Sequence, residues 1–251
     1  MKTLTVTPWG HLLRSSIGRK FLVAGSAAFL VLFMAAHTVG NLQIFLGPDQ
    51  LNHYAWFLHS LPYGLVWVFR ALVLVALVVH IGLAAMLHGE NQRRRGRGYL
   101  TEGYLSTSRA GLSMMITGTG LLLFLIWHVL HFTLQATIDY SMLHTYELPG
   151  VGVPVTNVYG MLYIAFSNPW MSLMYVVATG LVAVHMSHGV ASIFQSFGWR
   201  TSRLKPIQER ISRGFGLFVF VGLGSIPVAV LADSWLSLGI FDTSSFAQYL
   251  R

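Results

Sequence analysis

Long runs of apolar residues, separated by short polar segments, dominate the chain. Five runs are long enough to cross the hydrocarbon core of a bilayer as a helix, which takes about 20 residues. They cover residues 21–46, 64–87, 111–136, 170–197 and 215–232. No internal repeat or low-complexity segment interrupts them. The pattern predicts an all-α integral membrane bundle of five transmembrane helices, forming one domain over residues 1–251.

The polar segments between these runs alternate in charge. Fourteen basic residues lie before the first run, between the second and third, and between the fourth and fifth: Lys2, Arg14, Arg19, Lys20, Arg93, Arg94, Arg95, Arg97, Arg109, Arg200, Arg203, Lys205, Arg210 and Arg213. The other segments carry five acidic residues and one basic residue: Asp49, Asp139, Glu147, Asp233, Asp242 and Arg251. Because basic residues concentrate in cytoplasmic loops, we expect the N-terminal segment 1–20 in the cytoplasm. The C-terminus and the long loop 138–168 should then lie outside.

Composition agrees with this interpretation and narrows the chemistry. Of the 251 residues, 54% are hydrophobic and 10% are charged, as expected for a chain that faces lipid. The absence of cysteine excludes iron–sulfur clusters held by this chain, cysteine-bound zinc and covalently attached c-type haem. The net charge of +8 does not indicate nucleic-acid binding, because the basic residues lie in short loops between apolar runs.

Four apolar runs each carry a histidine deep inside: His37, His80, His128 and His185. Ionisable side chains at that depth are costly and usually functional. Measured along the helices from the outer polar residues, His37 and His128 lie about 17 Å deep, and His80 and His185 about 25 Å. Two histidines at matching height on facing helices are what a bis-histidine haem needs. The pattern therefore predicts two b haems, although a single membrane histidine can also simply hydrogen-bond to a neighbouring helix.

Three further residues inside the runs are candidates for cofactor contacts. His131 and His188 each follow a proposed ligand by three residues on roughly the same helix face. Either could replace that ligand or contact a haem propionate. Arg70 is the one basic residue well inside a run, and a buried guanidinium needs an anion. We expect a haem propionate or a quinone beside it, with extension of the side chain to the outer interface as the alternative.

Several short motifs follow one another in order along the chain. They are Phe33-Met34-Ala35-Ala36-His37, Val79-His80-Ile81-Gly82, Asn91 with Arg94 and Tyr99, Ser108-Arg109, Thr117-Gly118 before Trp127-His128, Asn157-Val158-Tyr159, and His185-Met186-Ser187-His188-Gly189 followed by Ser192, Gln195 and Gly198. Together they resemble the cytochrome b membrane subunit of succinate dehydrogenase. The similarity is to the single-subunit, five-helix, dihaem type that also serves fumarate reductases, and it covers residues 15–233.

The resemblance implies a ligand set. The first helix of this family pairs with the third, which implies His37 and His128 on the outer haem iron. The second pairs with the fourth, which implies His80 and His185 on the inner haem iron. Gly189 and the Phe197-Gly198 pair match the family spacing from His185, which favours it over His188.

The resemblance also implies partners and a location. The family anchors an iron–sulfur subunit, which binds a flavoprotein that oxidises succinate to fumarate, and it passes electrons to a membrane quinone (menaquinone or ubiquinone). This chain would be a subunit of that enzyme in a bacterial inner membrane, with no succinate chemistry of its own, and a higher oligomer of the complex is left open. The quinone could bind near the inner haem, at Ser15, Arg19 and Lys20, or near the outer one, at His59 and Arg70.

The chain departs from some relatives at positions that carry carboxylates. Relatives that reduce fumarate with menaquinol place one two residues before the fourth-helix ligand and another near the outer end of the second helix. Here the first position is Ala183, and residues 51–70 contain no Asp or Glu. A carboxylate proton path across the membrane is therefore not expected.

Two other functions remain as alternatives. The first is the haem b subunit of another quinone-linked complex, of the hydrogenase or formate dehydrogenase type. These often place two ligands on one helix, whereas the deep ligands here are single. The second is a transporter or metal-handling protein, which predicts carboxylates and broken helices in the spans. No Asp or Glu lies inside the first four runs, which disfavours it.

Overall fold

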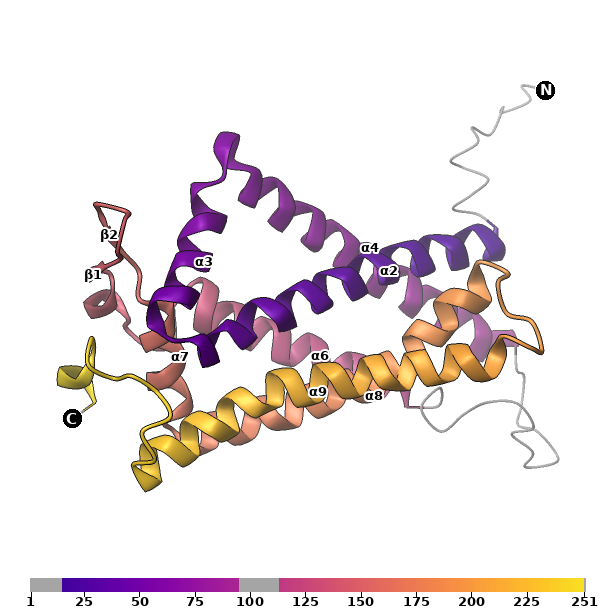
Figure 1. The fold of residues 1–251 in the computed structure, drawn as a ribbon. Coiled ribbons are helices and arrows are strands. Elements are labelled where there is room, and N and C mark those ends of the chain that lie inside the picture. Colours follow the sequence, from indigo (N-terminus) through magenta and orange to yellow (C-terminus); the bar gives the residue numbers. More distant parts are fainter. Residues whose placement is uncertain (1–14, 95–112, 251) are drawn as a thin grey trace.

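The computed structural model describes residues 15–94 and 113–250 and consists mostly of helices (Figure 1). Within these residues, five helices are long and apolar enough to cross a membrane. They are α2 (Ser16–Leu42), α4 (Leu65–Arg94), α6 (Met114–His128) together with the π-helix η3 (Val129–Thr133) that continues it, α8 (Pro169–Ser196) and α9 (Lys205–Leu236). The prediction of an α-helical chain with five such helices is confirmed.

The two ends of the bundle differ in structure (Figure 1) and in charge. At the basic end α2 begins, α4 and α8 end and α9 begins, and the described basic residues there are Arg19, Lys20, Arg93, Arg200, Arg203, Lys205, Arg210 and Arg213. The opposite, capped end holds the short elements: η1 (Gln43–Leu46), α3 (Pro48–Ser60), η2 (Pro62–Gly64), η4 (Ser141–Leu143), β1 (Tyr146–Glu147), β2 (Pro154–Val155), α7 (Val158–Phe166) and η5 (Ala247–Tyr249). Strands β1 and β2 pair antiparallel, with Tyr146 opposite Val155.

Local sequence explains where the long helices start. The Ser15 hydroxyl accepts a hydrogen bond from the backbone N–H of Gly18 at 2.9 Å, so it caps α2. Asn168 caps α8 in the same way, and Pro169 occupies the first helical position, where its missing N–H costs nothing. Both caps satisfy donors that a helix start would otherwise leave unpaired.

Helix boundaries differ from the apolar runs in a regular way. Helix α4 continues past residue 87 to Arg94, and α9 begins at Lys205 rather than at residue 215. These extra turns are polar and lie at the basic end. A helix can continue beyond the hydrocarbon because it satisfies its own backbone hydrogen bonds. In the third run, α6 ends at His128 and Val129–Thr133 form the π-helix η3, with Leu134 N–H bonded to the Val129 oxygen at 2.8 Å.

The connections at the capped end contain helices that the sequence pattern did not predict. Helix α3 joins the first two spans, and α7 lies within the loop 138–168. Buried Asn52 of α3 donates to Asn157 Oδ1 at 3.0 Å, and Asn157 caps α7 by accepting from Gly160 N–H at 2.9 Å. These bonds join two connections that are far apart in the sequence.

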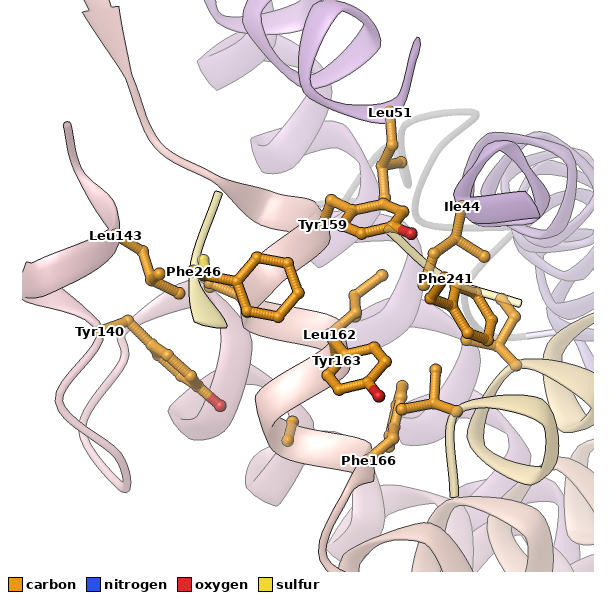
Figure 2. Close-up of a cluster of buried hydrophobic side chains, with 14 of the residues drawn as sticks. Ile44, Leu51, Tyr140, Leu143, Tyr159, Leu162, Tyr163, Phe166, Phe241 and Phe246 are labelled. Carbon is orange, nitrogen blue, oxygen red and sulfur yellow. The ribbon is translucent and has the colours of Figure 1, made fainter. Parts of the chain in front are cut away.

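The main cluster of buried apolar side chains lies at the capped end rather than between the spans (Figure 2). Its largest contributions come from α7 and from the segment after α9, including Tyr159, Leu162, Tyr163, Phe166, Phe241 and Phe246. By contrast, no described side chain of α4 is buried within the protein. The spans need no such core, because lipid is as apolar as their own side chains.

The spans instead pack through small residues. Helices α8 and α9 run side by side (Figure 1), and a Cβ added at Gly216 of α9 would lie 2.6 Å from the Ala183 oxygen of α8. A Cβ added at Gly222 would lie 2.6 Å from Thr38 Cγ2 of α2. Glycines thus bring α9 against both α8 and α2, as in other membrane helix pairs.

Some residues used above lie outside the described part of the chain. For the charge pattern these are Lys2, Arg14, Arg95, Arg97, Arg109 and Arg251, and for the motifs they are Tyr99, Ser108 and Arg109.

Candidate functional site

The four membrane histidines form two pairs in space. The ring centroids of His37 on α2 and His128 on α6 are 5.9 Å apart, with an angle of 87° between the ring planes. Those of His80 on α4 and His185 on α8 are 6.4 Å apart, with an angle of 74°. These are the same two pairs that the sequence predicted from the depths of the four histidines along their helices.

The two pairs lie at different heights in the bundle. His80 Nδ1 is 3.4 Å from the backbone oxygen of Val23 on α2. Val23 precedes His37 by fourteen residues on that helix, which corresponds to about 21 Å. The pair containing His80 therefore lies toward the basic end, and the pair containing His37 toward the capped end. They are called the inner and the outer pair below, after the predicted orientation.

Packing against α9 sets the direction of two of the rings. Thr38 lies against Gly222 of α9, and His37 precedes it by one residue, about 100° round the helix. Ala183 likewise lies against α9, and His185 follows it by two residues, about 200° round α8. His185 therefore lies on the face of α8 opposite α9, and His37 lies on the side of α2 next to the face that contacts α9. Ala183 itself lies against α9. It is the position that carries a carboxylate in some members of the family that the chain resembles.

Hydrogen bonds at the inner pair assign the ring protons. The partner of His80 Nδ1 is the Val23 carbonyl, which can only accept, so Nδ1 carries the proton. His185 Nδ1 is 3.2 Å from Thr117 Oγ1, whose own hydrogen is donated to the Ser113 oxygen at 3.0 Å. That hydroxyl therefore accepts from His185. In both rings Nε2 keeps its lone pair, the form in which imidazole binds a metal.

The outer pair has partners of a different kind. His128 Nδ1 lies 3.5 Å from the Tyr175 hydroxyl of α8, at the long end of the hydrogen-bond range. Asn41, one turn after His37, donates to the His37 backbone oxygen at 2.8 Å and lies 3.4 Å from both nitrogens of its ring. Phe33, one turn before, stacks on that ring at 5.5 Å. Neighbours on its own helix thus hold the His37 ring.

The spacing within each pair fits a metal bound between the rings. A metal–nitrogen bond is about 2.0 Å, and the nitrogen lies roughly 1.1 Å from the centre of a ring with bonds of about 1.3 Å. Two imidazoles on opposite sides of one metal therefore have centroids about 6.2 Å apart. The observed 5.9 and 6.4 Å lie on either side of this value.

The donor set fits haem better than a bare metal ion. In the described part of the chain no group of three or more His, Asp or Glu could hold a metal ion, and a structural zinc site takes four ligands. Haem brings four nitrogen donors and needs only two axial ones. One turn after His185, a Cβ added at Gly189 would meet no atom within 4 Å. This small residue leaves room for a flat group beside the inner pair.

His131 lies in the π-helix η3, three residues after His128, and both rings face the Tyr175 hydroxyl. Its ring is fully buried, with Nδ1 2.9 Å from the Tyr175 hydroxyl and Nε2 2.9 Å from the Tyr140 hydroxyl. Burial raises the pKa of Tyr140 above its ordinary value, so that phenol stays protonated. Both nitrogens of His131 are therefore used by tyrosines, which favours His128 as the ligand.

Arg70 lies near the start of α4 and is half-buried. Its Nη2 is 3.2 Å from His59 Nε2, and its guanidinium carbon lies 4.8 Å from the centre of the Trp67 ring. His59 is exposed, and its Nδ1 lies 2.8 Å from the Ala55 oxygen. These two candidate contact residues thus meet at the capped end.

The candidate contact residues near the start of α2 separate into different roles. Ser15 caps the helix, as described above. Buried Arg19 forms a two-bond ion pair with Glu90 of α4, with Nη2 3.0 Å from Oε2. Lys20 is exposed and lines an open cleft of about 380 Å³ between α2 and α8. His188 lies one turn beyond His185, whose ring is the one paired with that of His80.

Sequence reasoning missed the residues that hold the rings. Tyr175 and Tyr140 received no role, and Thr117 entered only as part of a motif. A signal existed for Tyr175 and Thr117, since each puts a hydroxyl inside an apolar run near the height of a proposed ligand on another helix. No comparable signal existed for Tyr140, because its approach to His131 depends on the fold of the capped end.

No family model, curated protein or solved structure matches this chain. The function is therefore argued from the residues and their geometry.

Proposed function

We propose that this chain is the membrane-anchoring cytochrome b subunit of a succinate:quinone oxidoreductase. The observation that carries the proposal is the arrangement of the two histidine pairs. Each pair joins two different spans with its ring centroids 5.9 or 6.4 Å apart. Bound between these rings, two b haems would supply the one-electron chemistry that links an iron–sulfur subunit to a membrane quinone.

The protein's own residues would bind and orient the cofactors. His80 and His185 present Nε2 because Val23 and Thr117 hold their Nδ1 protons. Such outer partners fix ring orientation and raise the basicity of a ligand. The inner pair lies toward the basic end, where the described Arg and Lys residues would offer a docking surface to the iron–sulfur subunit and its flavoprotein.

Replacement of single histidines tests the ligand assignment. The purified protein should show a reduced b-type spectrum with two haems per chain. His185→Ala and His37→Ala should each lose one haem and keep the other, because each removes one axial ligand of one pair. His188→Ala is the matched control, three residues from His185 on the same helix, and should keep both haems. A wild-type protein without haem would overturn the proposal, and loss of haem in His188→Ala alone would overturn the assignment of His185.

The electron donor tests the identity of the complex. In native membranes that contain the assembled complex, succinate should reduce the b haems, and a flavoprotein and an iron–sulfur protein should purify with this chain. Reduction by hydrogen or formate, with succinate inactive, would assign the chain to the alternative class of respiratory haem subunits.

A further inference from the structure

A buried chain of hydrogen bonds leads away from the outer histidine pair. His128 Nδ1 faces the Tyr175 hydroxyl at 3.5 Å, the same hydroxyl lies 2.9 Å from His131 Nδ1, and His131 Nε2 lies 2.9 Å from the Tyr140 hydroxyl. His131 is fully buried, and Tyr140 and Tyr175 are 1% and 7% exposed. The chain starts between the spans and ends at Tyr140, in the connection that follows α6.

The hydrogens of this chain allow two arrangements. In the first, His128 Nδ1–H donates to Tyr175, Tyr175 donates to His131 Nδ1, and His131 Nε2–H donates to Tyr140. In the second, every bond is reversed, so Tyr140 donates to His131 and Tyr175 donates to His128. A neutral imidazole has one N–H, so the second arrangement puts the proton of His128 on Nε2. Only the first leaves Nε2 free to bind iron.

We propose that Tyr175, His131 and Tyr140 are positioning residues for the outer haem, which stabilise the ligating tautomer of His128 in the first arrangement and set the reduction potential of that haem. The inference rests on the proposed function. Tyr175 accepts the Nδ1 proton of His128, His131 orients Tyr175 by accepting its hydrogen, and Tyr140 accepts the remaining His131 proton. The arrangement is the outer counterpart of Thr117 and His185 at the inner pair.

Surrounding aromatic rings hold the chain in place. The Tyr175 ring lies 5.0 Å from both Phe124 and Phe166, and the His131 ring stacks on Phe132 at 4.2 Å. In such apolar surroundings an unpaired hydroxyl or ring nitrogen is costly, so the three polar groups depend on one another. Packing alone would be served as well by phenylalanine at positions 140 and 175.

Loss of the Tyr175 hydroxyl should raise the reduction potential of the outer haem. Without an acceptor at Nδ1, His128 becomes a less basic ligand and stabilises oxidised iron less. We expect roughly a tenfold shift in the equilibrium between oxidised and reduced haem, or about 59 mV for one electron. The inner haem should keep its potential, because Tyr175 does not contact either inner ring.

The test is an optical redox titration of the purified, haem-loaded protein carrying Tyr175→Phe. His37→Ala, which should lack the outer haem, identifies the outer step in the titration. Thr117→Val is the crossed control: it removes the acceptor of His185 and should raise the inner step alone. Tyr140→Phe, two hydrogen bonds further from His128 than Tyr175, should raise the outer step by less than Tyr175→Phe. If the Tyr175→Phe protein does not accumulate, the titration is performed with Tyr140→Phe.

The outcomes separate this inference from the proposed function. A wild-type protein without haem overturns the proposed function itself. Two haems whose potentials stay unchanged in both tyrosine variants overturn only the inference, as does an equal shift of both steps. If the two tyrosines had a purely structural role, their replacement would lower thermal stability and leave the potential of the outer haem unchanged. An upward shift confined to the outer step supports the inference.

Discussion

At the scale of single residues, each histidine of the inner pair can serve two partners at once. The hydrogen bonds of His80 and His185 use Nδ1 and leave Nε2. The alternative interpretation, in which membrane histidines only hydrogen-bond to neighbouring helices, therefore accounts for one nitrogen of each inner ring. It does not account for pairs of rings at the distance that one metal requires.

The close approach of α8 and α9 predicts unequal effects of two similar substitutions. Gly216→Ala should destabilise the protein by about 1–3 kcal/mol, because its Cβ would lie 2.6 Å from the Ala183 oxygen and backbone cannot move aside cheaply. Gly214→Ala, two residues earlier on α9, meets nothing within 4 Å. It should be neutral or stabilise by up to about 1 kcal/mol, because alanine favours helix. Thermal unfolding in detergent measures both, and equal effects would contradict the packing described.

At the scale of elements, the long helices follow the apolar runs, whereas the capped end does not. Apolar runs predict spans because the bilayer forces every backbone group to bond within its own helix. Helices α3 and α7 gave no such signal, since their stability comes from contacts such as Asn52 with Asn157 across 105 residues. The π-turn after His128 was also invisible in the pattern, and so were the two tyrosine partners of His131.

Because Asn157 links α3, α7 and the C-terminal segment, its replacement should destabilise the protein more than the loss of an ordinary helix cap. Asn157→Ala should destabilise the protein by about 2–4 kcal/mol, since it removes the α7 cap, takes away the acceptor of the buried Asn52 Nδ2 and loses the bond to Ser245. The matched control is Asn168→Ala, an exposed cap that bonds only to its own helix. It should cost about 1 kcal/mol.

Thermal unfolding followed by tryptophan fluorescence compares these two caps. Asn157→Asp should recover part of the loss, because a carboxylate still accepts from Gly160 and Asn52. Equal losses for the two alanine variants would show that the capped end does not depend on this residue.

At the scale of the whole molecule, the two ends of the bundle differ in charge, and the sequence predicts that they lie on opposite sides of the membrane. The described basic residues gather where α9 begins, and Asp49, Asp139, Glu147, Asp233 and Asp242 gather at the capped end. The sequence predicted five spans, the pairing of four histidines and their order in depth. It could not predict the partners of those rings, because Thr117, Tyr175 and Val23 reach them only through tertiary packing.

The orientation has a direct test, since the chain has no cysteine of its own. Ser202→Cys places a thiol in the exposed connection before α9, and Ser141→Cys places one in η4 at the capped end. A maleimide that does not cross membranes should label Ser141→Cys in intact cells and Ser202→Cys only after the membrane is opened. The reverse pattern would contradict the predicted cytoplasmic N-terminus.

The central claim is that the two histidine pairs bind haem, and an experimental density map of the purified protein tests it most directly. The account predicts two flat densities, one between His37 and His128 and one between His80 and His185, each continuous with a ring nitrogen on both sides. Paired rings that bond only to neighbouring side chains, with no density between them, would contradict it.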